Sequence, residues 1–357
     1  MGYILFITIC VVAFILFKLA DLKDNKLFLV LGIITLSLGA GLRNDNVGLD
    51  TYQYISAFKT NFSVIWLFKE TGFREISRLL MNAFSGNVTC LLLLYATVTN
   101  ALILYRLWDF RKDCSYSYMV FLYITLHYMN TLNIMRQYIA IAIVFFATRF
   151  LEKRGYIKFC IAILLASVFH SSALLGLLFF FVYYWKVAPS KQKKWMLFPL
   201  LIAIPIVSIV LVKTQSAQIS NYFSQKRADV NATFIYRIIV FVLILALQYS
   251  KKEIIVFKER KGERETIGIN KCESIFYIAG LATSALGMFF SFLSRLGLYY
   301  LMFEIVFWEK LLKEEKVNSW LFCFSPYMQF MCLYVNFYIM VVGCSHMVFI
   351  GFDCDIS

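Results

Sequence analysis

The sequence is short of charged residues for a chain of its length. Only 16% of the 357 residues are charged, whereas 61% are hydrophobic. A soluble domain of this size needs more polar surface to cover its core. The excess apolar residues also fall in long runs, which favours contact with lipid over burial in one large core. The composition therefore predicts an integral membrane protein.

Clustered metal ligands are also lacking. The nine cysteines are scattered singly, and no CxxC or Cys/His cluster occurs. Because metal sites need several such ligands at short spacing, we expect no metal and no cofactor. The first apolar run has no basic residue before it and no small-residue cleavage site after it. We therefore expect a retained first span rather than a signal peptide.

What the sequence does contain is apolar runs of membrane-spanning length. A span needs roughly 20 apolar residues to cross about 30 Å of hydrocarbon, and its backbone must satisfy its own hydrogen bonds, which favours helices. We predict an all-α polytopic integral membrane protein, a single transmembrane domain over residues 1–357 with about twelve transmembrane helices. They are expected near residues 2–17, 27–42, 88–106, 116–133, 134–150, 157–169, 172–186, 195–213, 233–250, 274–294, 296–311 and 319–343.

The net charge of +14 is distributed unevenly along the chain. Alternate connectors between the spans together hold 24 of the 35 Lys and Arg residues. The positive-inside rule assigns this set to the cytoplasm and both chain termini to the outer side. The basic charge is thus a topology signal, and we expect no nucleic-acid partner. Outer loops are predicted at 43–87, with an amphipathic interfacial helix at 73–84, and at 214–233, and a cytoplasmic loop at 251–273.

Four ionisable side chains interrupt apolar runs: Arg136, His170, Arg237 and Arg295. Charge near hydrocarbon is costly, so each is a functional candidate. The predicted topology places all four at outer ends of their spans. Arginines clustered there suit a polyanion, because a guanidinium can donate two parallel hydrogen bonds to a phosphate. Snorkelling at a helix end is the alternative, and we favour it for Arg237 taken alone.

The segment 40–54 follows the second predicted span and is expected to face outward. Gly41 and Gly48 permit tight turns in it. Its other side chains supply charge and aromatic faces on which sugars can stack, namely Arg43, Asp45, Asp50, Tyr52 and Tyr54. By its chemistry alone the segment is a polar loop.

Five short elements follow one another along the chain: segments 41–43 and 47–52, Glu75, an Arg-Gln-x-x-Ala element at 136–140, a His-x-Ser-Ala element at 170–173, and an Arg-x-x-x-Tyr element at 295–299. In order, spacing and predicted outer placement they resemble the EpsG-type family of bacterial polysaccharide polymerases, relatives in role of the Wzy O-antigen polymerases. The resemblance covers residues 40 to 300. It departs from the family in one respect, since the proline expected after the last element is absent before Pro326.

The resemblance implies an enzyme, a glycosyltransferase of the bacterial cytoplasmic (inner) membrane. Such a polymerase joins undecaprenyl-pyrophosphate-linked oligosaccharide repeat units at the outer face, making O-antigen, capsule or exopolysaccharide. Its expected partners are the lipid-linked oligosaccharide, the lipid bilayer, a flippase and chain-length regulator proteins.

The site residues expected from this resemblance and from the chemistry form two groups. His170 is the expected catalytic base, because an imidazole held between apolar runs can stay neutral and accept a proton. Asp50 would orient His170 or the acceptor sugar, and Glu75 is a further acidic candidate. The expected substrate-binding residues are Arg43, Tyr52, Arg136, Gln137, Ser171, Arg237, Arg295 and Tyr299.

Two other classes of membrane protein fit part of the pattern. A lipid-linked oligosaccharide flippase also has about twelve spans and a basic cavity, but alternating access favours two similar halves and charges near mid-membrane. A membrane acyltransferase with a thioester donor needs its key histidine on the cytoplasmic side, whereas His170 is predicted to be external. The placement of the arginines at outer ends favours the polymerase.

Overall fold

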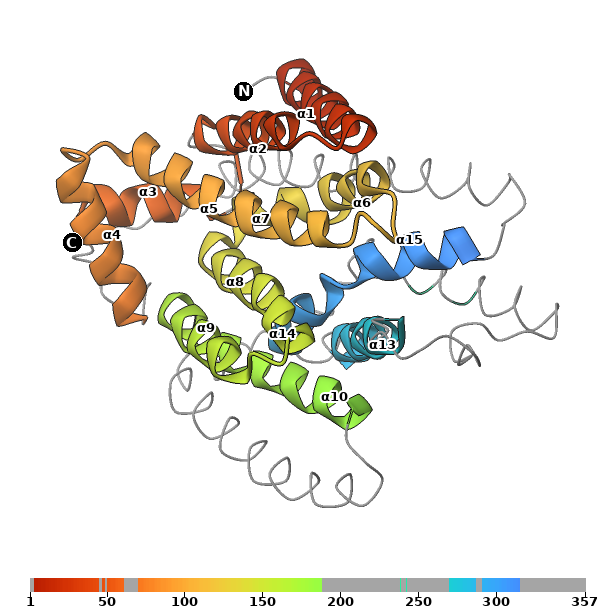
Figure 1. Cartoon of the computed structure of the whole chain (residues 1–357). Helices are drawn as coiled ribbons and strands as arrows, with labels where there is room; N and C mark the ends of the chain where they lie inside the picture. The colour runs from red at the N-terminus through yellow and green to blue at the C-terminus, as the bar shows by residue number, and fades with distance from the viewer. Residues whose placement is uncertain are drawn as a thin grey trace. The chain divides into compact units, whose positions relative to one another are not determined.

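A computed structural model describes residues 3–44, 47–48, 50–60, 70–187, 238, 242, 270–286 and 291–314 (Figure 1). Throughout these residues the regular structure is helical, which confirms the all-α prediction. The α-helices are α1 (Tyr3–Lys23), α2 (Lys26–Gly41), α3 (Thr51–Lys59), α4 (Thr71–Ala83), α5 (Val88–Asp109), α6 (Tyr116–Tyr123), α7 (Met129–Asn133), α8 (Met135–Glu152), α9 (Tyr156–Phe169), α10 (Leu177–Val187), α13 (Asn270–Leu286), α14 (Ser291–Leu301) and α15 (Glu304–Glu314).

Two of the described helices are long and apolar enough to cross a bilayer, Leu5–Lys23 and Val88–Asp109. Shorter apolar helices cover Lys26–Gly41, Tyr156–Phe169, Ser171–Tyr184 and Ile275–Ala285. Many large apolar side chains of these helices are exposed to the surroundings, among them Leu5, Ile15, Ile157 and Leu164. A lipid-facing surface accounts for that exposure. The twelve-span count and the orientation stay predictions.

The predicted span 296–311 is not one continuous helix. The run 296–311 is apolar almost throughout, yet the helix ends at Leu301 and a new one begins at Glu304. At 1.5 Å per residue, an eleven-residue helix such as α14 or α15 covers only about half of the hydrocarbon thickness. Glu304 is fully buried at the first turn of α15, where a helix dipole favours a negative charge.

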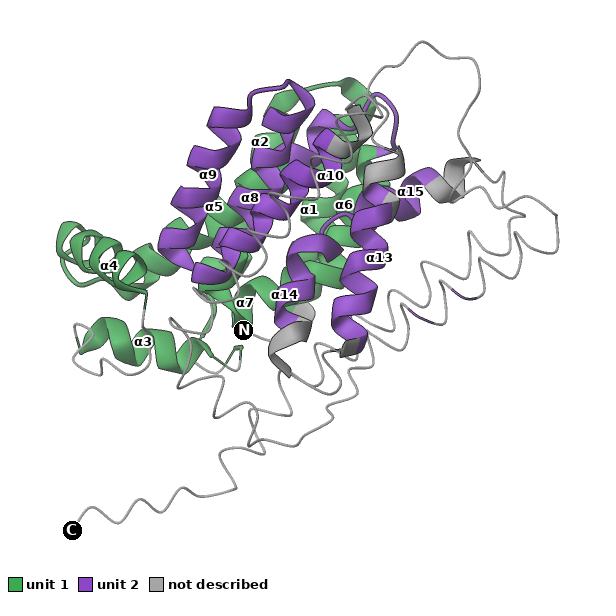
Figure 2. Ribbon diagram, turned by 90° about the horizontal axis from the view of Figure 1, so that it is seen from below, with its two compact units in different colours: residues 1–104, 116–138, 318–357 green, residues 105–115, 139–317 purple. Residues whose placement is uncertain are grey.

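The chain divides into two compact units (Figure 2). Unit 1 comprises Met1–Leu104, Tyr116–Tyr138 and Asn318–Ser357, and unit 2 comprises Tyr105–Ser115 and Ile139–Val317. Helices α5 and α8 therefore each begin in unit 1 and continue in unit 2. Each unit is described by itself.

In unit 1, α1 and α2 form an antiparallel hairpin, and the two helices lie side by side in Figure 1. Asn25 caps α2 by accepting a hydrogen bond of 2.8 Å from the Leu27 amide. Asp21 at the end of α1 accepts from the amide and hydroxyl of Ser117, which ties the hairpin to α6. The segment 116–133 is helical as predicted, although a π-helical turn (Ile124–Tyr128) separates α6 from α7.

Helix α4 covers the amphipathic stretch predicted at 73–84. Its buried side chains are Phe73, Ser77 and Met81, spaced four residues apart on one face. Phe73 stacks on Tyr95 of α5 with ring centroids 5.4 Å apart, and the Ser77 hydroxyl lies 2.7 Å from that of Tyr95. The helix is therefore fixed to unit 1 through this face.

In unit 2, α13 and α14 approach each other closely. A side chain at Gly297 would place its Cβ 2.7 Å from the Thr283 hydroxyl, and one at Gly280 would meet the Leu301 side chain at 2.9 Å. Both positions thus need glycine. Their contact fixes α14, which carries Tyr299, while Phe179, Phe276 and Phe303 form an aromatic core beside it.

Unit 2 also buries charges that the sequence suggested were in loops. Arg106 is fully buried and forms ion pairs with Asp109 and Glu152, while its Nε donates to the Thr148 hydroxyl. Arg149 lies 3.5 Å from the same Asp109. Two cations and two carboxylates therefore neutralise one another, as buried charges require. Arg106 is one of the basic connector residues used to predict the topology, but in the structure its side chain links α5 to α8.

Candidate functional site

The side chain of Arg43, from the polar loop after α2, makes its hydrogen bonds inside the protein. Its Nε donates to the Thr51 hydroxyl at 3.2 Å, and its two terminal nitrogens donate to the carbonyls of Ala40 at 2.5 Å and Leu132 at 3.3 Å. The side chain is 6% exposed, and burial lowers its pKa to about 10, which leaves it protonated. These bonds fasten the loop to the end of α7.

Gly48 shows why this loop needs its second glycine. Its φ of +97° is a conformation that side chains disfavour. A Cβ there would also lie 2.7 Å from the Thr51 hydroxyl and 3.0 Å from the Asn133 side-chain oxygen. Segment 47–52 therefore contacts the end of α7, which directly precedes the element 136–140 in unit 1.

The loop ends at Asp50, which occupies the N-cap of α3 without a capping hydrogen bond from its own side chain. Its carboxylate is close enough to act electrostatically on Tyr54. Tyr52 is 68% exposed, so its ring is available to a bound sugar. Tyr54 faces inward, and burial raises the pKa of its hydroxyl while the Arg136 charge opposes that shift.

Arg136, in the first turn of α8, lies against α3 and α4. It forms an ion pair with Glu70, and it donates a hydrogen bond to the Tyr54 hydroxyl. Its guanidinium carbon lies 5.9 Å from the centre of the Phe73 ring. The side chains of Arg136 and Glu70 keep exposures of 15% and 12%, so solvent still reaches the pair.

Glu70 was missed by the sequence analysis, which selected Glu75 instead. The structure places Glu70 at the N-cap of α4, directly before the amphipathic helix. Glu75 lies on the outer surface of α4 with an exposure of 47%, where it pairs with Arg74 at 3.1 Å and Arg78 at 3.2 Å. The hydrogen bond from Arg74, with a smaller effect of Arg78, lowers the pKa of Glu75 and makes it a weak base.

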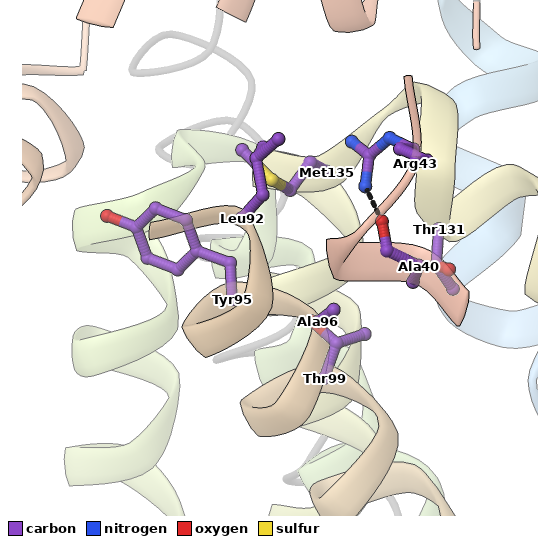
Figure 3. Close-up of a pocket in the computed structure, with 8 residues that line it drawn as sticks. All are labelled: Ala40, Arg43, Leu92, Tyr95, Ala96, Thr99, Thr131 and Met135. Carbon is purple, nitrogen blue, oxygen red and sulfur yellow. Dashed lines mark hydrogen bonds between the residues drawn. The ribbon is translucent and has the colours of Figure 1, made fainter. Parts of the chain in front are cut away.

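A small pocket opens beside Arg43 (Figure 3). In the figure the Arg43 guanidinium turns to the Ala40 carbonyl, and Thr99 and Thr131 supply the other polar groups. The lining residues are Ala40, Arg43, Leu92, Tyr95, Ala96, Thr99, Thr131 and Met135. Neither Arg136 nor Gln137, which is 3% exposed, lines it.

In unit 2, His170 ends α9 in an extended conformation and caps the 3₁₀ turn Ser171–Gly176. Its Nδ1 accepts a hydrogen bond of 3.3 Å from the Ser172 amide and lies 3.0 Å from the Ser172 hydroxyl. That hydroxyl is also 3.0 Å from the hydroxyl of Tyr299 on α14. Two elements of the sequence pattern, 170–173 and 295–299, are thus connected through Ser172, whereas the sequence analysis had singled out Ser171.

The amide hydrogen bond determines the tautomer of His170. A backbone N–H can only donate, so Nδ1 is an acceptor and the proton of the neutral ring is on Nε2. The nitrogen that faces Ser172 is therefore not the one that would meet a substrate. The ring can donate through Nε2 more readily than it can accept there.

Arg295 is exposed on α14, and Arg237 lies outside the described residues. The predicted site residues therefore form two groups. Unit 1 holds Arg43, Asp50, Tyr52, Glu75, Arg136 and Gln137, and unit 2 holds His170, Ser171, Arg295 and Tyr299.

Apolar helices with exposed hydrophobic faces, carrying polar loops and arginines beside their ends, are the features of a helical membrane protein. The model of the EpsG family matches residues 26–346, so the chain belongs to the EpsG family. That match confirms the resemblance found in the sequence and spans both groups of site residues. No curated protein and no solved structure matches the chain. The family supports, in general terms, a polysaccharide polymerase of glycosyltransferase type.

Proposed function

We propose that the chain polymerises undecaprenyl-pyrophosphate-linked oligosaccharide repeat units at the outer face of the bacterial cytoplasmic membrane. The observation that carries this proposal is the set of residues around Arg136. Its partly exposed side chain lies beside the Phe73 ring and hydrogen-bonds Tyr54 of α3, the helix that also carries the exposed Tyr52. Cations suit the pyrophosphate of a lipid-linked sugar, and aromatic faces suit the sugar itself.

In the proposed reaction the growing chain moves from its lipid carrier to the next repeat unit. The bond between the anomeric carbon and the pyrophosphate oxygen breaks, and that oxygen keeps the electron pair. A hydroxyl oxygen of the acceptor sugar bonds to the anomeric carbon and loses its proton to a base. Stabilising the negative charge on the departing pyrophosphate is the main electrostatic task of the site.

We assign that task to the arginines. Each of Arg136, Arg237 and Arg295 is a proposed ligand of phosphate oxygens, with Gln137 beside Arg136 in unit 1 and with Ser171 and Tyr299 in unit 2 as further proposed hydrogen-bonding residues. Arg43 serves indirectly, because its three hydrogen bonds fix the loop that ends at Asp50 and leads into α3, which carries Tyr52. Tyr52 would stack on a sugar.

The hydrogen bonds of His170 affect which group can accept the proton of the acceptor hydroxyl. Acting as a base through Nε2 would require the opposite tautomer and would break the bond from the Ser172 amide. We therefore propose that His170 donates its Nε2 proton in a hydrogen bond to a pyrophosphate oxygen. Asp50, at the N-cap of α3 after the Gly48 turn, is then the proposed base, ahead of Glu75 with its lowered pKa.

Deleting the gene tests the proposed function. A polymerase mutant still makes and exports single repeat units, so surface glycan should change from a ladder to a single-repeat band on a gel. Complementation with the intact gene should restore the ladder. Complete loss of surface glycan would instead indicate the flippase function.

A second prediction concerns topology. The basic loop 251–273 should be cytoplasmic, because it carries seven of the Lys and Arg residues that define the inner side. Alkaline phosphatase fused after Arg260 should then be inactive, whereas a fusion after Ser220 in the predicted outer loop should be active. Activity at Arg260 would reverse the orientation and move the site to the cytoplasmic face.

A further inference from the structure

The Arg136 guanidinium, proposed above as a ligand of pyrophosphate, already has an anionic partner. Glu70 neutralises it, and Tyr54 and Phe73 surround it. An arginine in this state cannot bind a second anion at full strength, because the carboxylate repels the incoming charge and occupies part of the fork. Either the pair is purely structural, or Glu70 must move when the donor binds.

The position of Glu70 favours movement. It stands at the N-cap of α4, yet its side chain makes no capping hydrogen bond to that helix. The first turn of α4 therefore offers backbone amides and the positive end of a helix dipole within reach of the same carboxylate. Glu70 thus has two alternative partners, Arg136 and the start of α4.

The accessibility of the pair is consistent with exchange. Both side chains keep more than a tenth of their surface exposed, so the pair is not sealed in the core. By contrast, the structural ion pair of Arg106 in unit 2 has its arginine fully buried. A pyrophosphate diester carries more negative charge than a carboxylate, so it can replace Glu70 on Arg136.

We propose that Glu70 is an exchangeable counter-ion of Arg136. In the unloaded protein it neutralises the guanidinium; when the lipid-linked donor binds, the pyrophosphate takes its place and Glu70 turns to the N-terminus of α4. After transfer, Glu70 returns to Arg136 and helps to expel the undecaprenyl pyrophosphate product. This inference rests on the proposed function, and it makes Glu70 a positioning residue that sets how tightly pyrophosphate is held.

The exchange predicts opposite effects of one substitution on binding and on turnover. In Glu70→Gln the competitor is gone, so purified full-length protein in nanodiscs should bind inorganic pyrophosphate at least about tenfold more tightly, the ratio expected if the pair is closed about nine-tenths of the time. Polymerisation should become slower, with a lower KM for the lipid-linked donor and a lower kcat, because product release is impaired. If the pair were merely structural, Glu70→Gln would not tighten the binding of pyrophosphate or lower the KM for the donor.

Asp24→Asn is the matched control, since it also removes one carboxylate from unit 1. Asp24 is exposed in the turn between α1 and α2 with a φ of +44°, which asparagine tolerates. Its affinity for pyrophosphate should equal that of the wild type. Equal affinity of Glu70→Gln and wild type, with both proteins folded, would overturn the exchange.

A charge-swapped double variant keeps the test decisive if Glu70→Gln does not fold. Glu70→Arg with Arg136→Glu rebuilds the pair in reverse, so it should restore folding but neither pyrophosphate binding nor polymer. Polymer at the wild-type level from the swap would mean that the pair is structural. Arg136→Ala separates this inference from the proposed Arg136 site. If Arg136→Ala loses pyrophosphate binding while Glu70→Gln binds as the wild type does, only the exchange is rejected. If Arg136→Ala binds pyrophosphate as well as the wild type, the Arg136 site itself is rejected.

Discussion

Replacing Arg136 by lysine should nearly abolish polymer. Lysine keeps the positive charge and can still pair with Glu70, but it lacks the planar fork that donates two hydrogen bonds to one phosphate. Losing one such stabilising contact typically lowers a reaction rate by about 100-fold or more. The same substitution at Arg295 should have a similar effect, because its side chain is exposed on α14 and is likewise a proposed ligand of phosphate oxygens. Chain length on glycan gels measures both outcomes.

Arg111→Lys is a suitable control for this prediction. Arg111 lies over the Trp108 ring at 4.6 Å and has no assigned role, so the exchange should leave the ladder unchanged. Protein levels should be compared by immunoblot. Wild-type chain lengths in both the Arg136 and Arg295 lysine variants, at normal protein level, would leave snorkelling as the role of these arginines.

The sequence alone predicted most of the helices, for a simple physical reason. Long apolar runs must be helical in a bilayer, so α1, α5 and α8 begin and end near the predicted spans. The break at Met302 and Phe303 was not predictable, because both residues are as apolar as their neighbours. A composition that is uniform along a run carries no signal for where tertiary packing interrupts it.

The candidate site was predictable in its arginines but not in their partners. An arginine between apolar residues stands out in any sequence, and the structure places Arg136 in the first turn of α8 with its side chain partly exposed. Its partner Glu70 is 66 residues away, and one carboxylate among several in a polar segment cannot be singled out without the fold. The same holds for Ser172, since only the 3₁₀ turn determines which of two adjacent serines meets His170.

Replacing His170 by asparagine and by glutamine should give different results. Asparagine can place its side-chain oxygen where Nδ1 is, so it can accept from the Ser172 amide and keep the cap. It offers nothing at the position of Nε2, and polymerisation should fall by about 100-fold, as for loss of an oxyanion donor. Glutamine places an amide N–H near the position of Nε2 and should retain about a tenth of the activity, although it cannot take up a proton.

Equal activity of the two variants would distinguish a base from a donor. If His170 removed the proton of the acceptor hydroxyl, glutamine would be as inactive as asparagine, and the rate of the residual reaction would lose its dependence on histidine ionisation. If His170 donates a hydrogen bond, the glutamine variant keeps making polymer. The pH dependence of the rate is then set by the ionisation of Asp50, so Asp50→Asn should be the inactive variant. Equal inactivity of both His170 variants at normal protein level, with polymer retained in Asp50→Asn, would return the role of base to His170.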